Sequence, residues 1–127
     1  MTADQQAWMD RAERALDAAR VLLDHDSVEA CLNRAYYAAF YAARAALSGV
    51  GEQPKTHAAT QSCFAFHFVR TGQLPASVGR LLVDAFESRL RADYDALTVH
   101  DTRAAADALA DAEAFVVAIR SLLAPTP

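Results

Sequence analysis

The stretch CLNRAYYAAFYAARAAL, residues 31–47, decides the fold of this chain. Apart from its tyrosines and its one cysteine, only Asn33, Arg34 and Arg44 interrupt its apolar sequence, so as a helix it is apolar around most of its circumference. Its small residues form one broad wall at helical spacing: Cys31, Ala35, Ala38, Ala42, Ala45 and Ala46. Water on any face of this helix would leave apolar area exposed, and we therefore predict that it lies inside a helical bundle.

One polar stripe remains on this helix, and functional residues are expected there. The stripe consists of Asn33, Arg34, Tyr37, Tyr41 and Arg44, and a bulky ridge of Tyr36, Phe40 and Leu47 lies beside the alanine wall. Two arginines that flank two phenols could cradle a phosphate or stack a base. The alternative is structural, because tyrosines at helical spacing are often core residues whose hydroxyls are satisfied at the rim.

Length and composition indicate a single globular domain. The chain has 127 residues, 54% of them hydrophobic, which is enough to bury a core without metal or disulfide support. The formal charge of −4 argues against a wide phosphate-binding surface but is compatible with a local basic pocket. Lys55 is the only lysine among the twelve cationic residues, and arginine suits bidentate or buried pairing.

Cysteine and histidine spacing predicts neither a metal site nor a cofactor. Cys31 and Cys63 lie in apolar helical sequence without a CxxC motif, and we expect buried free thiols. The histidines lack ligand spacing, and there is no glycine-rich phosphate loop. The N-terminal sequence is charged and no long uncharged apolar segment occurs, so we expect a soluble cytoplasmic protein without a membrane span.

Helical periodicity accounts for the remainder of the chain. The other predicted helices are residues 3–23, 57–70, 76–92 and 102–123, and the central helix ends at residue 48. Predicted N-terminal caps are Asp26 or Ser27, Thr56 and Asp101. We therefore predict one all-α domain over residues 1–127, an antiparallel bundle of four long helices plus a shorter one, with residues 124–127 frayed.

Arg89 is the most unusual residue of the predicted bundle, because it falls on the inner face of the fourth helix. Asp93 lies one turn later on the same side, and Tyr94 is adjacent, whereas Arg91 faces outward. A buried guanidinium must be paired or open onto a cleft. The sequence thus leaves two interpretations of Arg89 and Asp93, a structural ion pair that closes the helix end or a functional pocket.

His57 begins the third helix, directly after Lys55 and Thr56. A helix N-terminus has free N–H groups, so these three residues form a candidate anion site. A capping threonine beside a surface histidine is the alternative.

Several segments, taken in order, resemble the HEPN (higher eukaryotes and prokaryotes nucleotide-binding) domain family. They are NRAYYAAFYAARAAL, PKTH, FHFVRTGQLP, RLRADY and ADALADAEAFVVAI. The resemblance covers residues 4–123 and implies a bundle of four to five helices that commonly forms homodimers. It also implies a toxin that is a metal-independent ribonuclease, paired with a minimal nucleotidyltransferase antitoxin.

The family's catalytic site is an arginine followed, after four to six residues, by a histidine near a helix end. By position Arg89 matches the arginine, but Tyr94 stands after four intervening residues, and His100 is too far along. A phenol, with an ordinary pKa of about 10, is a poor general base near neutral pH.

Three hypotheses follow from the residues and the resemblance. The first is a toxin-like RNA-directed protein that acts through Arg89, Asp93 and Tyr94. The second is a non-catalytic nucleotide-binding or adaptor subunit that docks a nucleotidyltransferase, and the third is a structural helical dimer. The residues that would bind nucleotide or phosphate are Asn33, Arg34, Tyr37, Tyr41, Arg44 and His57.

Overall fold

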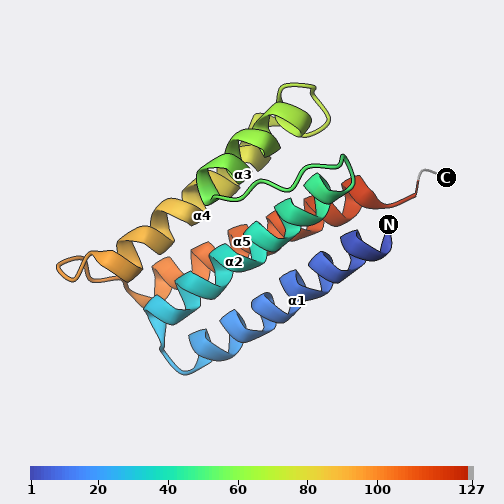
Figure 1. The fold of residues 1–127 in the computed structure, drawn as a ribbon. Coiled ribbons are helices and arrows are strands. Elements are labelled where there is room, and N and C mark those ends of the chain that lie inside the picture. The colour runs from blue at the N-terminus through green and yellow to red at the C-terminus, as the bar shows by residue number, and fades with distance from the viewer. Residues whose placement is uncertain (126–127) are drawn as a thin grey trace.

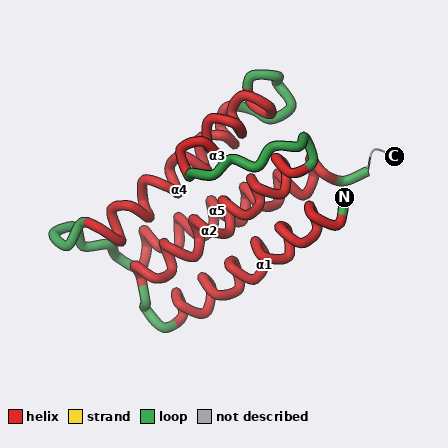
Figure 2. The backbone as a smooth tube through the Cα atoms, viewed as in Figure 1, coloured by secondary structure: helices red, strands yellow, loops and turns green. Residues whose placement is uncertain are grey.

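The computed structural model describes residues 1–125, in which all regular secondary structure is helical (Figures 1 and 2). The elements are α1 (Ala3–Asp24), α2 (Val28–Ser48), α3 (His57–Phe64), the π-helix η1 (Ala65–Val69), α4 (Ala76–Tyr94) and α5 (Thr102–Leu123). The predicted all-α class is confirmed. The last two residues of the predicted frayed tail lie outside the described residues.

The central element is α2, as the opening stretch predicts. Figure 1 shows α1 antiparallel to α2, with α4 and α5 on the other sides of α2 and α3 beside α4. The predicted alanine wall is buried, with Ala38 and Ala42 both 0% exposed. Small side chains allow α1 and α5 to approach α2 closely, so burial of this wall holds the bundle together.

The helix α4 lies at the edge of the bundle and is less buried than the others. Leu82 is its one buried residue, whereas Val78, Leu81, Ala85 and Phe86 of its predicted inner face are half-buried. The helix runs to Tyr94, two residues beyond the predicted end at residue 92. This extension places Asp93 on the helical face that carries Arg89.

Side-chain capping agrees with the prediction at two helix starts and differs at a third. Thr56 accepts a hydrogen bond from the Ala59 N–H at 3.0 Å, and Asp101 accepts one from Ala104 at 2.8 Å. At α2, Ser27 occupies the N-cap position, one of the two predicted, but its side chain makes no cap hydrogen bond. The preceding Asp26 has φ +56°, and Ser27 itself has φ −84° and ψ 76°, which differs from the extended geometry of a side-chain cap.

The predicted helix at residues 57–70 is divided into two parts. It is α-helical to Phe64 and continues as η1, in which the Arg70 N–H donates to the Ala65 carbonyl at 2.9 Å. Phe64 and Phe68 are both buried despite the change in helical pitch. The wider turn therefore keeps the two aromatic side chains on the core side.

Both cysteines are free, as predicted, but only one is fully buried. Cys31 is 0% exposed, and burial raises the pKa of its thiol, whereas Cys63 is half-buried. Across residues 1–125, no helix has the length and apolar character needed to cross a membrane.

Candidate functional site

A polar cluster lies where α2, α4 and the start of α3 meet. Its innermost contact joins the Tyr36 hydroxyl to Nδ1 of His57 at 2.5 Å. The Tyr36 residue is only 1% exposed, and the His57 ring also stacks on Phe86 of α4, with centroids 5.8 Å apart. The first residue of α3 is therefore fixed against two other helices.

The electrostatics of this contact keep both groups neutral. Burial lowers the pKa of His57, and the positive charges of Arg89 and then Arg44 lower it further. Burial is also the main cause that raises the pKa of Tyr36. The hydroxyl has no other hydrogen-bond partner among residues 1–125, so we infer that it donates to Nδ1. The neutral imidazole then carries its proton on Nε2 and acts there as a hydrogen-bond donor.

Arg89 lies on the inward side of α4, as the sequence predicts, and its side chain is 13% exposed. Its Nε lies 2.9 Å from Oδ2 of Asp93, so the two groups form an ion pair. The N–H does not point at that oxygen, however, and the buried Nε has no hydrogen-bond partner in the described chain. The pair is thus held by charge attraction, and one N–H of the guanidinium stays unused.

Two tyrosine rings of α2 line the position of this guanidinium. Its carbon lies 5.8 Å from the Tyr36 centroid and 5.6 Å from the Tyr37 centroid. Contact with the ring faces stabilises a cation that has lost part of its water. Of the two interpretations that the sequence left open, the geometry shows the ion pair, and the guanidinium also lies near two aromatic rings.

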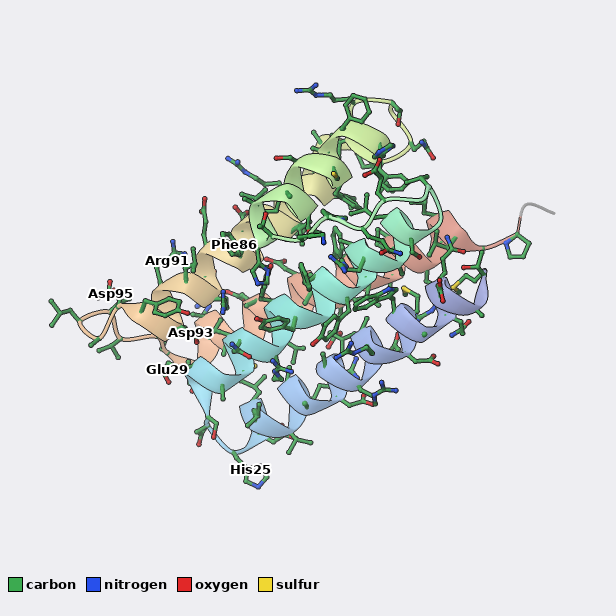
Figure 3. The ribbon with its side chains drawn as sticks, in the orientation of Figure 1. His25, Glu29, Phe86, Arg91, Asp93 and Asp95 are labelled. Atoms are coloured by element: carbon green, nitrogen blue, oxygen red, sulfur yellow. The ribbon has the colours of Figure 1, made fainter. Side chains whose placement is uncertain are left out.

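A chain of polar contacts extends from Asp93 across α2. Asp93 Oδ2 accepts a hydrogen bond from Asn33 Nδ2 at 3.2 Å. Asn33 Oδ1 in turn accepts from Nε and Nη2 of Arg34, at 3.0 and 2.9 Å. Figure 3 shows Asp93 on the side of α4 that faces α2 and Arg91 on the outer side. The contacts thus join Arg34 to Arg89 through an amide and a carboxylate.

Of the remaining predicted site residues, Tyr94 lies beside the cluster, whereas Tyr41 and Arg44 lie toward α1. Tyr94 is 75% exposed at the end of α4, with its ring 5.8 Å from the guanidinium carbon of Arg89. Tyr41 stacks on Trp8 of α1, with centroids 5.9 Å apart. Arg44 donates to the Pro54 carbonyl and lies 5.0 Å from the Trp8 centroid. The polar stripe of α2 therefore faces two places, α4 at one end and α1 at the other.

Two contributors to the cluster, Tyr36 and Phe86, were predicted only as packing residues. The signal for Tyr36 was present, because a tyrosine predicted to be wholly buried needs a partner for its hydroxyl. The partner was not identifiable, since His57 is 21 residues away across a loop.

Comparisons with known proteins agree with the architecture. The HEPN domain family model matches residues 5–122. A UPF0332 protein of Gloeobacter violaceus is 42% identical over 100 residues, which are 79% of each chain. A UPF0332 protein of Thermotoga maritima is 33% identical over 91% of this chain and 88% of its own length. A protein of Methanocaldococcus jannaschii named "Putative toxin MJ0605" is 34% identical over 93% of this chain and 87% of its own.

The family match covers nearly the whole described bundle, and these relatives align over most of their own lengths. The chain belongs to the HEPN domain family.

Proposed function

We propose that this protein is a toxin-like HEPN protein that acts on RNA, and that the cluster around Arg89 binds a phosphate of the RNA backbone. The observation that carries this proposal is the largely buried guanidinium of Arg89, whose Nε–H has no hydrogen-bond partner in residues 1–125. Such a group gains a strong charge-assisted hydrogen bond when an anionic oxygen reaches it. Two relatives bear the name of toxin, which is consistent with this assignment.

In its catalytic form, the proposal is metal-independent cleavage of a phosphodiester bond. The RNA 2′-oxygen attacks the adjacent phosphorus, the bond from phosphorus to the 5′-oxygen breaks, and a 2′,3′-cyclic phosphate forms. Asp93, the carboxylate paired with Arg89, accepts the 2′-hydroxyl proton, and the Tyr94 phenol gives a proton to the leaving 5′-oxygen. Arg89 stabilises the negative charge that develops on the phosphorane. The Nε2–H of His57 donates a hydrogen bond that helps to hold the same phosphate group.

The test compares two arginines of the same helix. We expect Arg89→Ala to slow cleavage of single-stranded RNA by about 10²–10³-fold, the usual effect of removing one preorganised donor. Arg91→Ala is the matched control, because Arg91 faces outward and is exposed. Cleavage should persist in EDTA. Equal cleavage by both variants, or no cleavage by the wild-type protein, would rule out the catalytic form.

A second candidate function is a non-catalytic nucleotide-binding or adaptor subunit that docks a nucleotidyltransferase. The state of His57 favours it, because an imidazole whose Nδ1 is bound by Tyr36 and whose pKa is lowered is suited to donating a hydrogen bond rather than accepting a proton. Calorimetry with nucleotides, together with co-purification of a nucleotidyltransferase encoded beside the gene, tests this candidate. Absence of both interactions removes it.

We also propose that the protein forms a homodimer. Large apolar side chains are exposed where α4 leads into α5, with Leu97 at 94% and Val99 at 90% exposure. Burial of these side chains against a second copy would remove them from water. Light scattering should give twice the chain mass, and a monomer at all concentrations would contradict the proposal.

A further inference from the structure

A second concentration of arginines lies between α1 and α2, outside the cluster around Arg89. A hollow of about 250 Å³ is lined there by Arg11 and Arg14 of α1 and by Arg34 and Tyr41 of α2. We call it the α1–α2 groove. The protein carries a net charge of −4, so the gathering of three cations in one hollow is contrary to its overall composition.

Neighbouring carboxylates do not neutralise these arginines. Within residues 1–125, Arg11, Arg14 and Arg34 form no ion pair with an acidic side chain, whereas Arg20, on the same helix as the first two, pairs with Asp17 and Glu113. Like charges held close together repel one another unless an anion lies between them. The groove therefore favours a negatively charged ligand.

The aromatic rings of the groove hold the guanidinium groups in place. The guanidinium carbon of Arg11 lies 4.8 Å from the Tyr41 centroid, and that of Arg34 lies 4.8 Å from the Tyr37 centroid. Stacking leaves guanidinium N–H groups available for phosphate oxygens, although Nε and Nη2 of Arg34 already donate to Asn33. Arginines interleaved with aromatic rings are the arrangement that binds single-stranded nucleic acid.

Arg34 of the groove is linked by side-chain contacts to the Arg89 cluster. The guanidinium carbons of Arg34 and Arg89 lie 4.8 and 5.6 Å from the centroid of the same ring, that of Tyr37. The same two arginines are joined through Asn33 and Asp93. The two arginine sites are therefore close enough for successive phosphates of one strand to contact both.

We propose that the α1–α2 groove binds the phosphates of a single RNA strand that flank the phosphate at Arg89, with Arg11 and Arg14 as contacts. This inference rests on the proposed RNA-directed function and extends it to a binding path over α1. The aromatic rings and the link to Arg89 favour a nucleic-acid strand, whose bases can stack. An acidic protein surface would use only the charge of the arginines.

The experiment measures binding without cleavage. A fluorescein-labelled single-stranded RNA with 2′-O-methyl groups lacks the attacking hydroxyl, so its fluorescence anisotropy reports binding alone. We expect R11Q/R14Q to bind it about tenfold more weakly. The slope of log affinity against log salt concentration should fall by about 1.4, because each phosphate contact of a single strand contributes about 0.7. The control R70Q/R103Q also removes two positive charges, from exposed positions at the end of η1 and on α5. It should bind the RNA like the wild type.

Three results would overturn the inference. They are unchanged affinity and slope in R11Q/R14Q, an equal loss in R70Q/R103Q, and equally effective competition by poly-glutamate, which carries charge but no bases. Both substituted arginines of α1 are exposed, so the fold should persist, and urea unfolding checks this. Cleavage by Arg89→Ala is measured separately with unmodified RNA. If the protein binds the uncleavable RNA through the groove but cleaves no RNA, the catalytic form is refuted and the inference about the groove stands.

Discussion

Removal of the Tyr36 hydroxyl should destabilise the protein out of proportion to the loss of one oxygen atom. The hydroxyl lies 2.5 Å from His57 Nδ1, and the Tyr36 residue is 1% exposed. Tyr36→Phe leaves the imidazole nitrogen without its partner, which costs about 1–3 kcal/mol. For a domain of this size, each kcal/mol corresponds to a fall of about 4 °C in Tm.

The converse substitution should have a similar effect for the opposite reason. His57→Phe keeps the aromatic stacking on Phe86 and Phe40, with centroids 5.8 and 4.7 Å away in the native ring, but leaves the buried hydroxyl of Tyr36 unpaired. We expect a cost of about 1–3 kcal/mol here as well. The double variant removes both polar groups together, so its stability should lie within about 1 kcal/mol of the wild type.

Urea unfolding followed by circular dichroism measures all three free energies of unfolding. Tyr37→Phe is the control, because its half-buried ring is adjacent and its hydroxyl has no hydrogen bond in the described chain; its effect should stay below about 0.5 kcal/mol. Strict additivity of the two single substitutions would refute the reasoning, since it would mean that the hydroxyl and the imidazole do not depend on each other.

Three further predictions concern pH, packing and capping. The pKa of His57 is lowered in the folded protein, so as pH falls the unfolded chain, with a histidine pKa of about 6.5, binds a proton first. The free energy of unfolding should therefore fall as pH drops below about 6.5 and level off below the folded pKa. Urea unfolding across pH should show a smaller decrease in His57→Phe. Ala42→Leu adds volume to a residue that is 0% exposed and should cost about 1–3 kcal/mol by the same assay, while an unchanged midpoint would show that the α2 wall has room. Asp101→Ala should cost about 1 kcal/mol because it removes a cap at 2.8 Å, whereas Ser27→Ala should change the thermal midpoint little, and equal losses would contradict the assignment of caps.

The contrast between these two helix starts shows what could be predicted from the sequence. A cap is a local contact, so Asp101 was identifiable from the residues that follow it. Ser27 is in an equally suitable sequence, but the left-handed backbone of Asp26 sets the direction of the chain there. The buried position of α2 was predictable for a related reason, because it depends on the spacing of apolar residues along one helix.

The site was predictable only where the residues in contact are close together in the sequence. Arg89 and Asp93 are one helical turn apart, and their ion pair follows from periodicity. The contact of Asn33 with Asp93 spans 60 residues, and it depends on how α4 crosses α2. The path of the loop between α2 and α3 likewise decides that His57 meets Tyr36. Neither path can be predicted from a local sequence pattern, because both result from the packing of the whole bundle.

The proposed phosphate site at Arg89 depends on contacts that exist before a ligand binds. Asp93 and the rings of Tyr36 and Tyr37 fix the guanidinium before any ligand arrives, so little side-chain entropy is left to lose on binding. The Nε–H has no aligned acceptor in the described chain, but the atom is buried, so the guanidinium must shift before a phosphate oxygen can bind to it. The net negative charge of the protein works against non-specific binding of polyanions, so the proposed site depends on this local arrangement and not on overall charge.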